Sequence, residues 1–186
     1  MDTIRTARVC AVIGILGAAG AVAYVFAVLA VFSPSDETPY LIPIHLAGLA
    51  GAVALGLSGA AAGGTWRAGI AIAVAGMLAF VAAEITAPGA ASDVLYGVAP
   101  MAAALGLVLA GVAALRGGRW RGWHRYVPLV AGAWIVVVIL PVMVASDPAA
   151  HHTAAPLLVL GAWHALFGAM CVAVLAETRA AERVPA

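Results

Sequence analysis

Three ionisable side chains lie inside long apolar segments of the sequence: His45, Glu84 and His164. An ionisable group inside a membrane is costly to bury, so each of these side chains marks a candidate functional site. Two imidazoles and a carboxylate can hydrogen-bond a polar solute, and they can also act as general acids and bases. The sequence therefore leaves both solute binding and acid–base catalysis open at these positions.

Helical spacing places both histidines on faces made of small residues. These small neighbours, with one thiol among them, are Gly48, Ala52 and Gly59 for His45, and Gly161, Gly168 and Cys171 for His164. Small residues mark the contact faces of membrane helices because they let two backbones approach closely. We therefore expect both imidazoles to point into a helical bundle, whereas the larger helical neighbours of Glu84 leave its direction open.

The three side chains share one half of the membrane. Counted along their helices, they lie roughly 5–12 Å below the same surface. We expect them to converge on a polar cavity that opens on the outer side, together with further polar residues of that side: Asp93, Asp147, His151 and His152. In the simpler interpretation each His donates to a backbone carbonyl of a neighbouring helix, and Glu84 extends its carboxylate to the lipid headgroups.

A metal or haem site has weaker support. Asp147, His151 and His152 share one outer segment, but they lack a recurrent spacing such as His-x-x-x-His, so we assign no metal site. We assign no cofactor either. Haem ligation through His45 and His164 stays an alternative, because it needs only two facing rings at similar depth.

The segment Gly56-Leu57-Ser58-Gly59 resembles the nucleophile motif of rhomboid intramembrane proteases. In that family the serine works with a histidine on another helix. Here Ser58 lies near the opposite membrane surface from His164, and a nucleophile and its base must be within hydrogen-bond reach. We therefore do not expect a protease.

Composition identifies the elements that must position these residues. The 186 residues are 65% hydrophobic and 9% charged, against roughly 25% charged in soluble domains. Such a chain is neither soluble nor disordered, and a net charge of +1 does not suit a nucleic-acid binder. Six continuous apolar segments of about 20 residues predict an all-α integral membrane protein with one domain over 1–186. These six transmembrane helices are predicted at 9–32, 41–62, 68–87, 94–115, 127–145 and 156–176.

The first of these segments is too long for the apolar region of a signal peptide, so we interpret it as a retained helix. Orientation follows from the basic residues, which number nine and are all Arg. All nine lie in the chain ends or in the turns that face one side of the membrane. The positive-inside rule makes that side cytoplasmic. The N- and C-termini are then both predicted to be cytoplasmic. The absence of Lys also excludes a retinal or pyridoxal Schiff base.

The cytoplasmic turns combine basic and aromatic residues. The segment from 116 to 126 is predicted to anchor the chain to lipid headgroups through Arg116, Arg119, Trp120, Arg121, Trp123 and Arg125. Its start, Gly-Gly-Arg-Trp-Arg at 117–121, matches Gly-Gly-Thr-Trp-Arg at 63–67. Either every inner turn needs Gly, Trp and Arg, or two helical hairpins are duplicated.

Two cysteines, Cys10 and Cys171, lie toward the reducing side without a Cys-x-x-Cys motif, so we expect free thiols. The Arg-rich, Lys-free composition is typical of a GC-rich bacterial genome, which favours the inner membrane of a bacterium. The leading functional prediction is small-solute transport, or a substrate-binding membrane subunit. The alternatives are an enzyme acting on a lipid or isoprenoid, and a structural subunit of a membrane complex. The expected partners are the lipid bilayer and either a membrane partner subunit or a second copy of the chain, without nucleic acid.

Overall fold

The computed structural model describes residues 3–30, 38–146 and 154–182, and every regular element in these residues is helical. Five spans are single helices: α1 (Thr3–Ala30), α2 (Thr38–Leu57), α3 (Gly64–Thr86), α4 (Ala90–Gly117) and α7 (Ala154–Glu182). The fifth of the six spans is composite and is described below. Six helical segments of 19 to 28 residues are long and apolar enough to cross a membrane. The chain is thus a six-helix polytopic membrane protein, as the sequence predicts.

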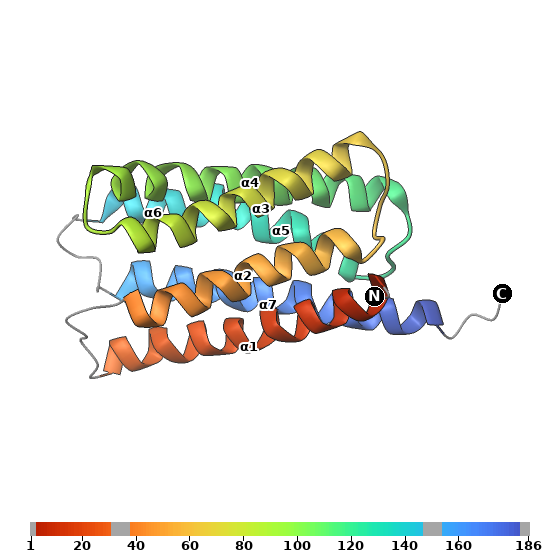
Figure 1. The fold of residues 1–186 in the computed structure, drawn as a ribbon, viewed down its shortest axis with the longest axis horizontal. Coiled ribbons are helices and arrows are strands. Elements are labelled where there is room, and N and C mark those ends of the chain that lie inside the picture. Colours follow the sequence, from red (N-terminus) through yellow and green to blue (C-terminus); the bar gives the residue numbers. More distant parts are fainter. Residues whose placement is uncertain (1–2, 31–37, 147–153, 183–186) are drawn as a thin grey trace.

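The six spans lie side by side in two layers (Figure 1). One layer holds α1, α2 and α7, and the other holds α3, α4 and the fifth span. Each span contacts the next along the chain, and α7 closes the ring by packing on both α1 and the fifth span. Helix α7 also contacts α2 across the ring, whereas α1 packs only on α2 and α7 among the described elements.

The contact between α3 and α4 is made of small residues. A Cβ added to Gly69 would lie 2.6 Å from the Ala110 backbone nitrogen, and one added to Gly76 would lie 2.5 Å from that of Ala103. Gly106 of α4 faces the Ala73 backbone in the same way. Inside a bilayer the hydrophobic effect does not drive two helices together, so the van der Waals contacts of this close approach stabilise the pair.

The fifth span is not one regular helix. It begins with a 3-10 turn, η1 (His124–Tyr126), and continues through α5 (Val127–Trp134), a π-helical turn, η2 (Ile135–Ile139), and α6 (Leu140–Ala145). The Leu140 N–H donates to the Ile135 carbonyl, five residues back. Pro141 follows at once and has no N–H to donate. The wide turn thus lies directly before a residue that cannot continue the regular hydrogen-bond pattern.

Helix α2 ends at Leu57, five residues earlier than the predicted 62. The Ser58 hydroxyl donates to the Leu55 carbonyl over 2.6 Å and accepts the Ala60 N–H at 3.3 Å. Gly59 then adopts a φ of +71°, which Gly adopts without strain. The hydroxyl of the protease-like segment therefore caps a turn at the end of α2.

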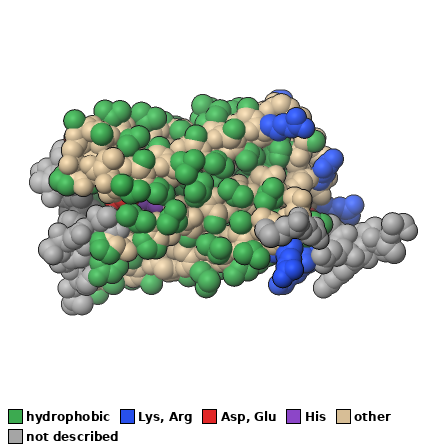
Figure 2. Space-filling model, viewed as in Figure 1, with side chains coloured by type: hydrophobic (Ala, Val, Ile, Leu, Met, Phe, Trp, Pro, Cys, Tyr) green, Lys and Arg blue, Asp and Glu red, His purple; other side chains and the backbone are tan. Residues whose placement is uncertain are grey.

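The described Arg residues gather at one end of the bundle (Figure 2). Helix α1 begins and helix α7 ends at that same end (Figure 1). The segregation that the sequence predicts is thus present, with Arg183 lying outside the described residues. Apolar side chains cover the visible sides of the bundle between its two ends, as a bilayer-facing surface requires (Figure 2).

Candidate functional site

His45 and Glu84 contact each other between α2 and α3. The His45 Nδ1 lies 3.4 Å from the Glu84 Oε1, and the two side chains are 12% and 3% exposed. The His45 ring stacks on Phe80, with centroids 4.8 Å apart and planes 18° apart. Phe80 and Glu84 are one turn apart and so lie on the same face of α3. Phe80 contacts the flat side of the His45 ring, and Glu84 contacts its Nδ1.

His164 enters from α7 and lines the same cavity as His45. The cavity lies between α1, α2, α3 and α7, and its remaining lining residues are Gly14, Ala18, Ile44, Gly48, Met77, Trp163 and Phe167. The structure therefore brings together His45 and Glu84 by direct contact, and His45 and His164 around one cavity. That Glu84 and both histidines act as a single site stays a prediction.

The cavity is small. The space open to water centres is about 10 Å³, which is about what one buried water molecule needs. Pockets for organic ligands have volumes of roughly 300–1,000 Å³. In this conformation the cavity has room for neither a haem group nor a large solute.

Indole hydrogen bonds hold the side of the cavity that α7 forms. The Trp163 Nε1 donates to the Ala131 carbonyl at 3.2 Å, and the Trp134 Nε1 donates to the Val159 carbonyl at 3.0 Å. Both bonds join α5 to α7. They hold Trp163, and with it the neighbouring His164, against the fifth span.

Of the other polar residues predicted for the cavity, the structure describes only Asp93, which is not among the lining residues. Asp93 is exposed in the first turn of α4. Asp147, His151 and His152 lie outside the described residues. Their convergence with His45 and Glu84 stays a prediction.

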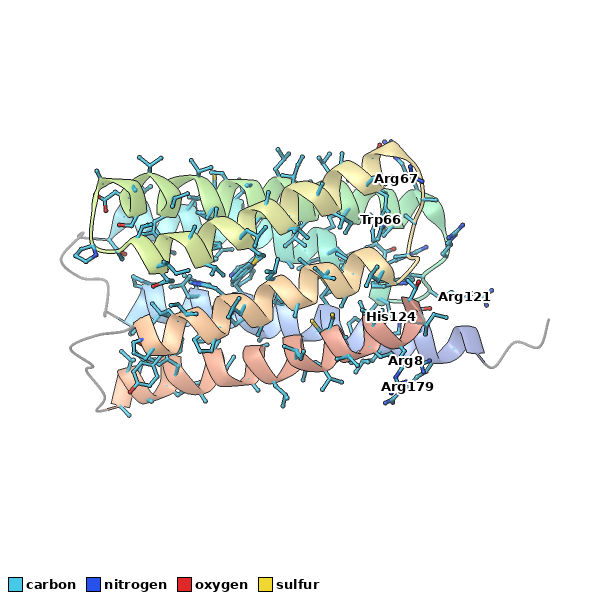
Figure 3. The ribbon with its side chains drawn as sticks, in the orientation of Figure 1. Arg8, Trp66, Arg67, Arg121, His124 and Arg179 are labelled. Atoms are coloured by element: carbon cyan, nitrogen blue, oxygen red, sulfur yellow. The ribbon has the colours of Figure 1, made fainter. Side chains whose placement is uncertain are left out.

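A second polar cluster lies at the Arg-rich end, and the sequence did not single it out (Figure 3). His124 Nδ1 lies 2.7 Å from Glu177 Oε1, and the backbone N–H of Arg121 donates to the same oxygen at 3.2 Å. Nearby, the Arg8 guanidinium donates to the Thr178 carbonyl at 2.7 Å. In the sequence, only Glu177 could have indicated this cluster, because it is an acidic residue close to the Arg residues of the predicted cytoplasmic side.

The lipid-anchor prediction needs correction at one residue. Trp120 is only 3% exposed and belongs to the hydrophobic core, whereas Trp123 is 54% exposed. Trp66, the equivalent residue in the other Gly-Gly turn, is likewise buried. A large side chain at the Arg-rich end of a bundle of small residues fills the space between helices, so both indoles are packed within the protein.

Both cysteines are free, as predicted. Cys171 is buried beneath α1 and α2, where a Cβ added to Gly14 or Gly51 would lie 2.5 or 2.9 Å from its Sγ. The thiol thus fills the space that these two glycines leave.

Within residues 3–30, 38–146 and 154–182, no three His, Cys, Asp or Glu side chains group as metal ligands. The two histidines of the cavity are accompanied instead by a thioether, that of Met77. No family model, curated protein or solved structure matched the chain.

Proposed function

We propose that the chain is a small-solute carrier, or the solute-binding subunit of one, and that its solute site is built from His45 and His164, with Glu84 beside His45. The observation that carries this proposal is the His45–Glu84 contact, which is buried inside two membrane-spanning helices. Ionisable groups at such positions are costly and mark solute or ion pathways. A subunit that only packs against a partner has no need of them.

The packing of α1 supports a carrier with an occluded site. Helix α1 covers the cavity through Gly14 and Ala18, two residues without bulk. It contacts only α2 and α7 among the described elements. A shift of α1 would open the cavity without breaking the tight α3–α4 contact, which gives the solute a way in and out.

A lipid-modifying enzyme is the second candidate, and one groove favours it. Between α1 and α2 lies an open groove of about 310 Å³, with the rings of Tyr24 and Tyr40 stacked 5.6 Å apart along it. Ile44 lines both this groove and the histidine cavity. A lipid chain in the groove would place its polar end close to His45.

The carrier is tested in liposomes. Purified protein is reconstituted on a solid-supported membrane, and currents are recorded as amino acids, sugars, organic acids and metal ions are applied in turn. We expect a current with at least one class of solute, and we expect Glu84→Gln to abolish it. Glu177→Gln, the matched change at the other polar cluster, should leave the current in place.

Absence of any current from folded protein contradicts the carrier. A new product in lipid extracts incubated with the protein, lost in Glu84→Gln, would favour the enzyme instead. A partner subunit that co-purifies with both the wild-type protein and Glu84→Gln, without flux or product, would favour the structural role.

We infer a bacterial cytoplasmic membrane as the location from the Arg-rich, Lys-free composition. We place both chain ends inside because α1 begins and α7 ends at the Arg-rich end of the bundle (Figures 1 and 2). A reporter that is active only in the cytoplasm should be active when fused after residue 186. A reporter active only outside the membrane should be active when inserted after residue 89, in the connection between α3 and α4. The reversed pattern would overturn the orientation.

A further inference from the structure

We propose that the cavity between α1, α2, α3 and α7 binds one Cu(I) ion through the imidazoles of His45 and His164 and the thioether of Met77. Binding depends only on the residues that line this cavity or lie directly beside it. That Cu(I) is also the solute rests on the carrier function proposed above.

The donor set selects the metal. His45, His164 and Met77 come from three different helices and line the same cavity. The Met77 sulfur lies at its wall, because a Cβ added to Gly48, another lining residue, would be 3.2 Å from the Sδ. Thioether ligands favour Cu(I), and imidazole suits copper as well. Zinc prefers four nitrogen, thiolate or carboxylate ligands, a set that the cavity lining does not offer.

Glu84 contacts the ring nitrogen of His45 that would not bind the metal. A metal-bound His commonly uses its second ring nitrogen to contact a carboxylate, which fixes the ring and its tautomer. Here the Nδ1 of His45 faces Glu84 at 3.4 Å, which leaves Nε2 for a metal. Glu84 is therefore a positioning residue for His45.

The small volume of the cavity and its apolar walls suit an ion without its hydration shell. The cavity takes about one water molecule, so a hydrated ion or an organic solute does not fit in this conformation. Trp163 and Phe167 form apolar walls and are almost fully buried. A weakly hydrated, soft ion that accepts few ligands is the cation that such a site can desolvate.

Binding is measured on the full chain in detergent, without oxygen and with a reductant present. Cu(I) is titrated against a chromophoric Cu(I) chelator, and X-ray absorption at the copper edge reports the ligand atoms. We expect one Cu(I) per chain with two nitrogen neighbours and one sulfur neighbour. Ag(I) should compete for the site, and Zn(II) should not.

Matched variants show whether a loss of Cu(I) binding comes from a lost ligand or from a disturbed fold. Met77→Leu should remove the sulfur signal and weaken Cu(I) binding at least tenfold, whereas Met170→Leu, at a core residue that does not line the cavity, should change neither. Glu84→Gln should weaken binding about 10- to 100-fold while the sulfur neighbour stays. A Cys10→Ser, Cys171→Ala double variant should bind Cu(I) normally.

Three outcomes would overturn the site: no Cu(I) bound by folded protein, loss of binding in the cysteine variant, or Zn(II) held in preference. Uptake of 64Cu into liposomes distinguishes this proposal from the carrier function. Bound Cu(I) without uptake, and without current for any other solute, would defeat the carrier and leave the site standing. Current with another solute and no bound Cu(I) would defeat the site and leave the carrier standing.

Discussion

Gly106→Leu is expected to unfold the bundle or to destabilise it by about 3 kcal/mol or more. A Cβ at this position would lie 2.6 Å from the Ala73 Cα and 2.7 Å from the Gly69 carbonyl oxygen. These are backbone atoms, so no side-chain rotation relieves the contact, and α3 and α4 must separate. Overpacking of this kind typically costs about 1–3 kcal/mol and more where the backbone cannot move.

The free energy of unfolding is measured in mixed micelles of a mild detergent and dodecyl sulfate, with helix content followed by circular dichroism. Gly97→Leu is the matched control on the same helix, since a Cβ there meets no atom within 4 Å. It should leave the free energy of unfolding within about 0.5 kcal/mol of wild type. Equal stability of the Gly97 and Gly106 variants would show that α3 and α4 do not meet through Gly106.

The second large effect is expected at the buried His45–Glu84 pair. His45→Leu and Glu84→Leu should each destabilise the protein by about 3–5 kcal/mol, because each change leaves a charged or polar group beside an apolar side chain. The double variant should cost less than the sum of the two. We expect a coupling energy of about 1–3 kcal/mol from the thermodynamic cycle.

The His124–Glu177 pair provides the comparison. Its side chains are 20% and 16% exposed and lie at the Arg-rich end, where water and salt screen the interaction. Although its contact is shorter, at 2.7 Å, its coupling energy should be about 1 kcal/mol or less. A larger coupling at this pair than at His45–Glu84 would contradict the view that the bilayer interior strengthens the buried contact.

The number and type of helices could be predicted from the sequence because each span is a long, continuous apolar run. The burial of Trp120 and Trp66 could not be predicted in the same way. A Trp beside Arg at a helix end is equally suited to headgroups and to an inter-helix gap, and only the neighbouring surfaces decide. The early end of α2 depends on Ser58 and Gly59, whose role in a turn is not evident from the sequence in a chain rich in small residues.

The candidate site was partly predictable for a similar reason. The cost of burying His45, Glu84 and His164 singled them out, and the small-residue faces indicated that both histidines point inward. The contribution of Met77 could not be inferred, because a Met in a membrane helix usually serves as packing. Its placement depends on which face α3 turns toward α2, and α4 determines that through the Gly69 and Gly76 contacts.

The π-helical turn over residues 135–139 has a consequence for the phase of the fifth span. Each residue of an α-helix advances the side-chain direction by about 100°, and the wide turn inserts one residue more than the regular ladder holds. Helix α6 therefore contacts α7 but not α4, whereas α5 contacts both. Removing one residue from the turn would rotate α6 by that angle relative to α5. It would carry Val144, now 85% exposed, away from its lipid-facing direction and move a different set of side chains onto α7.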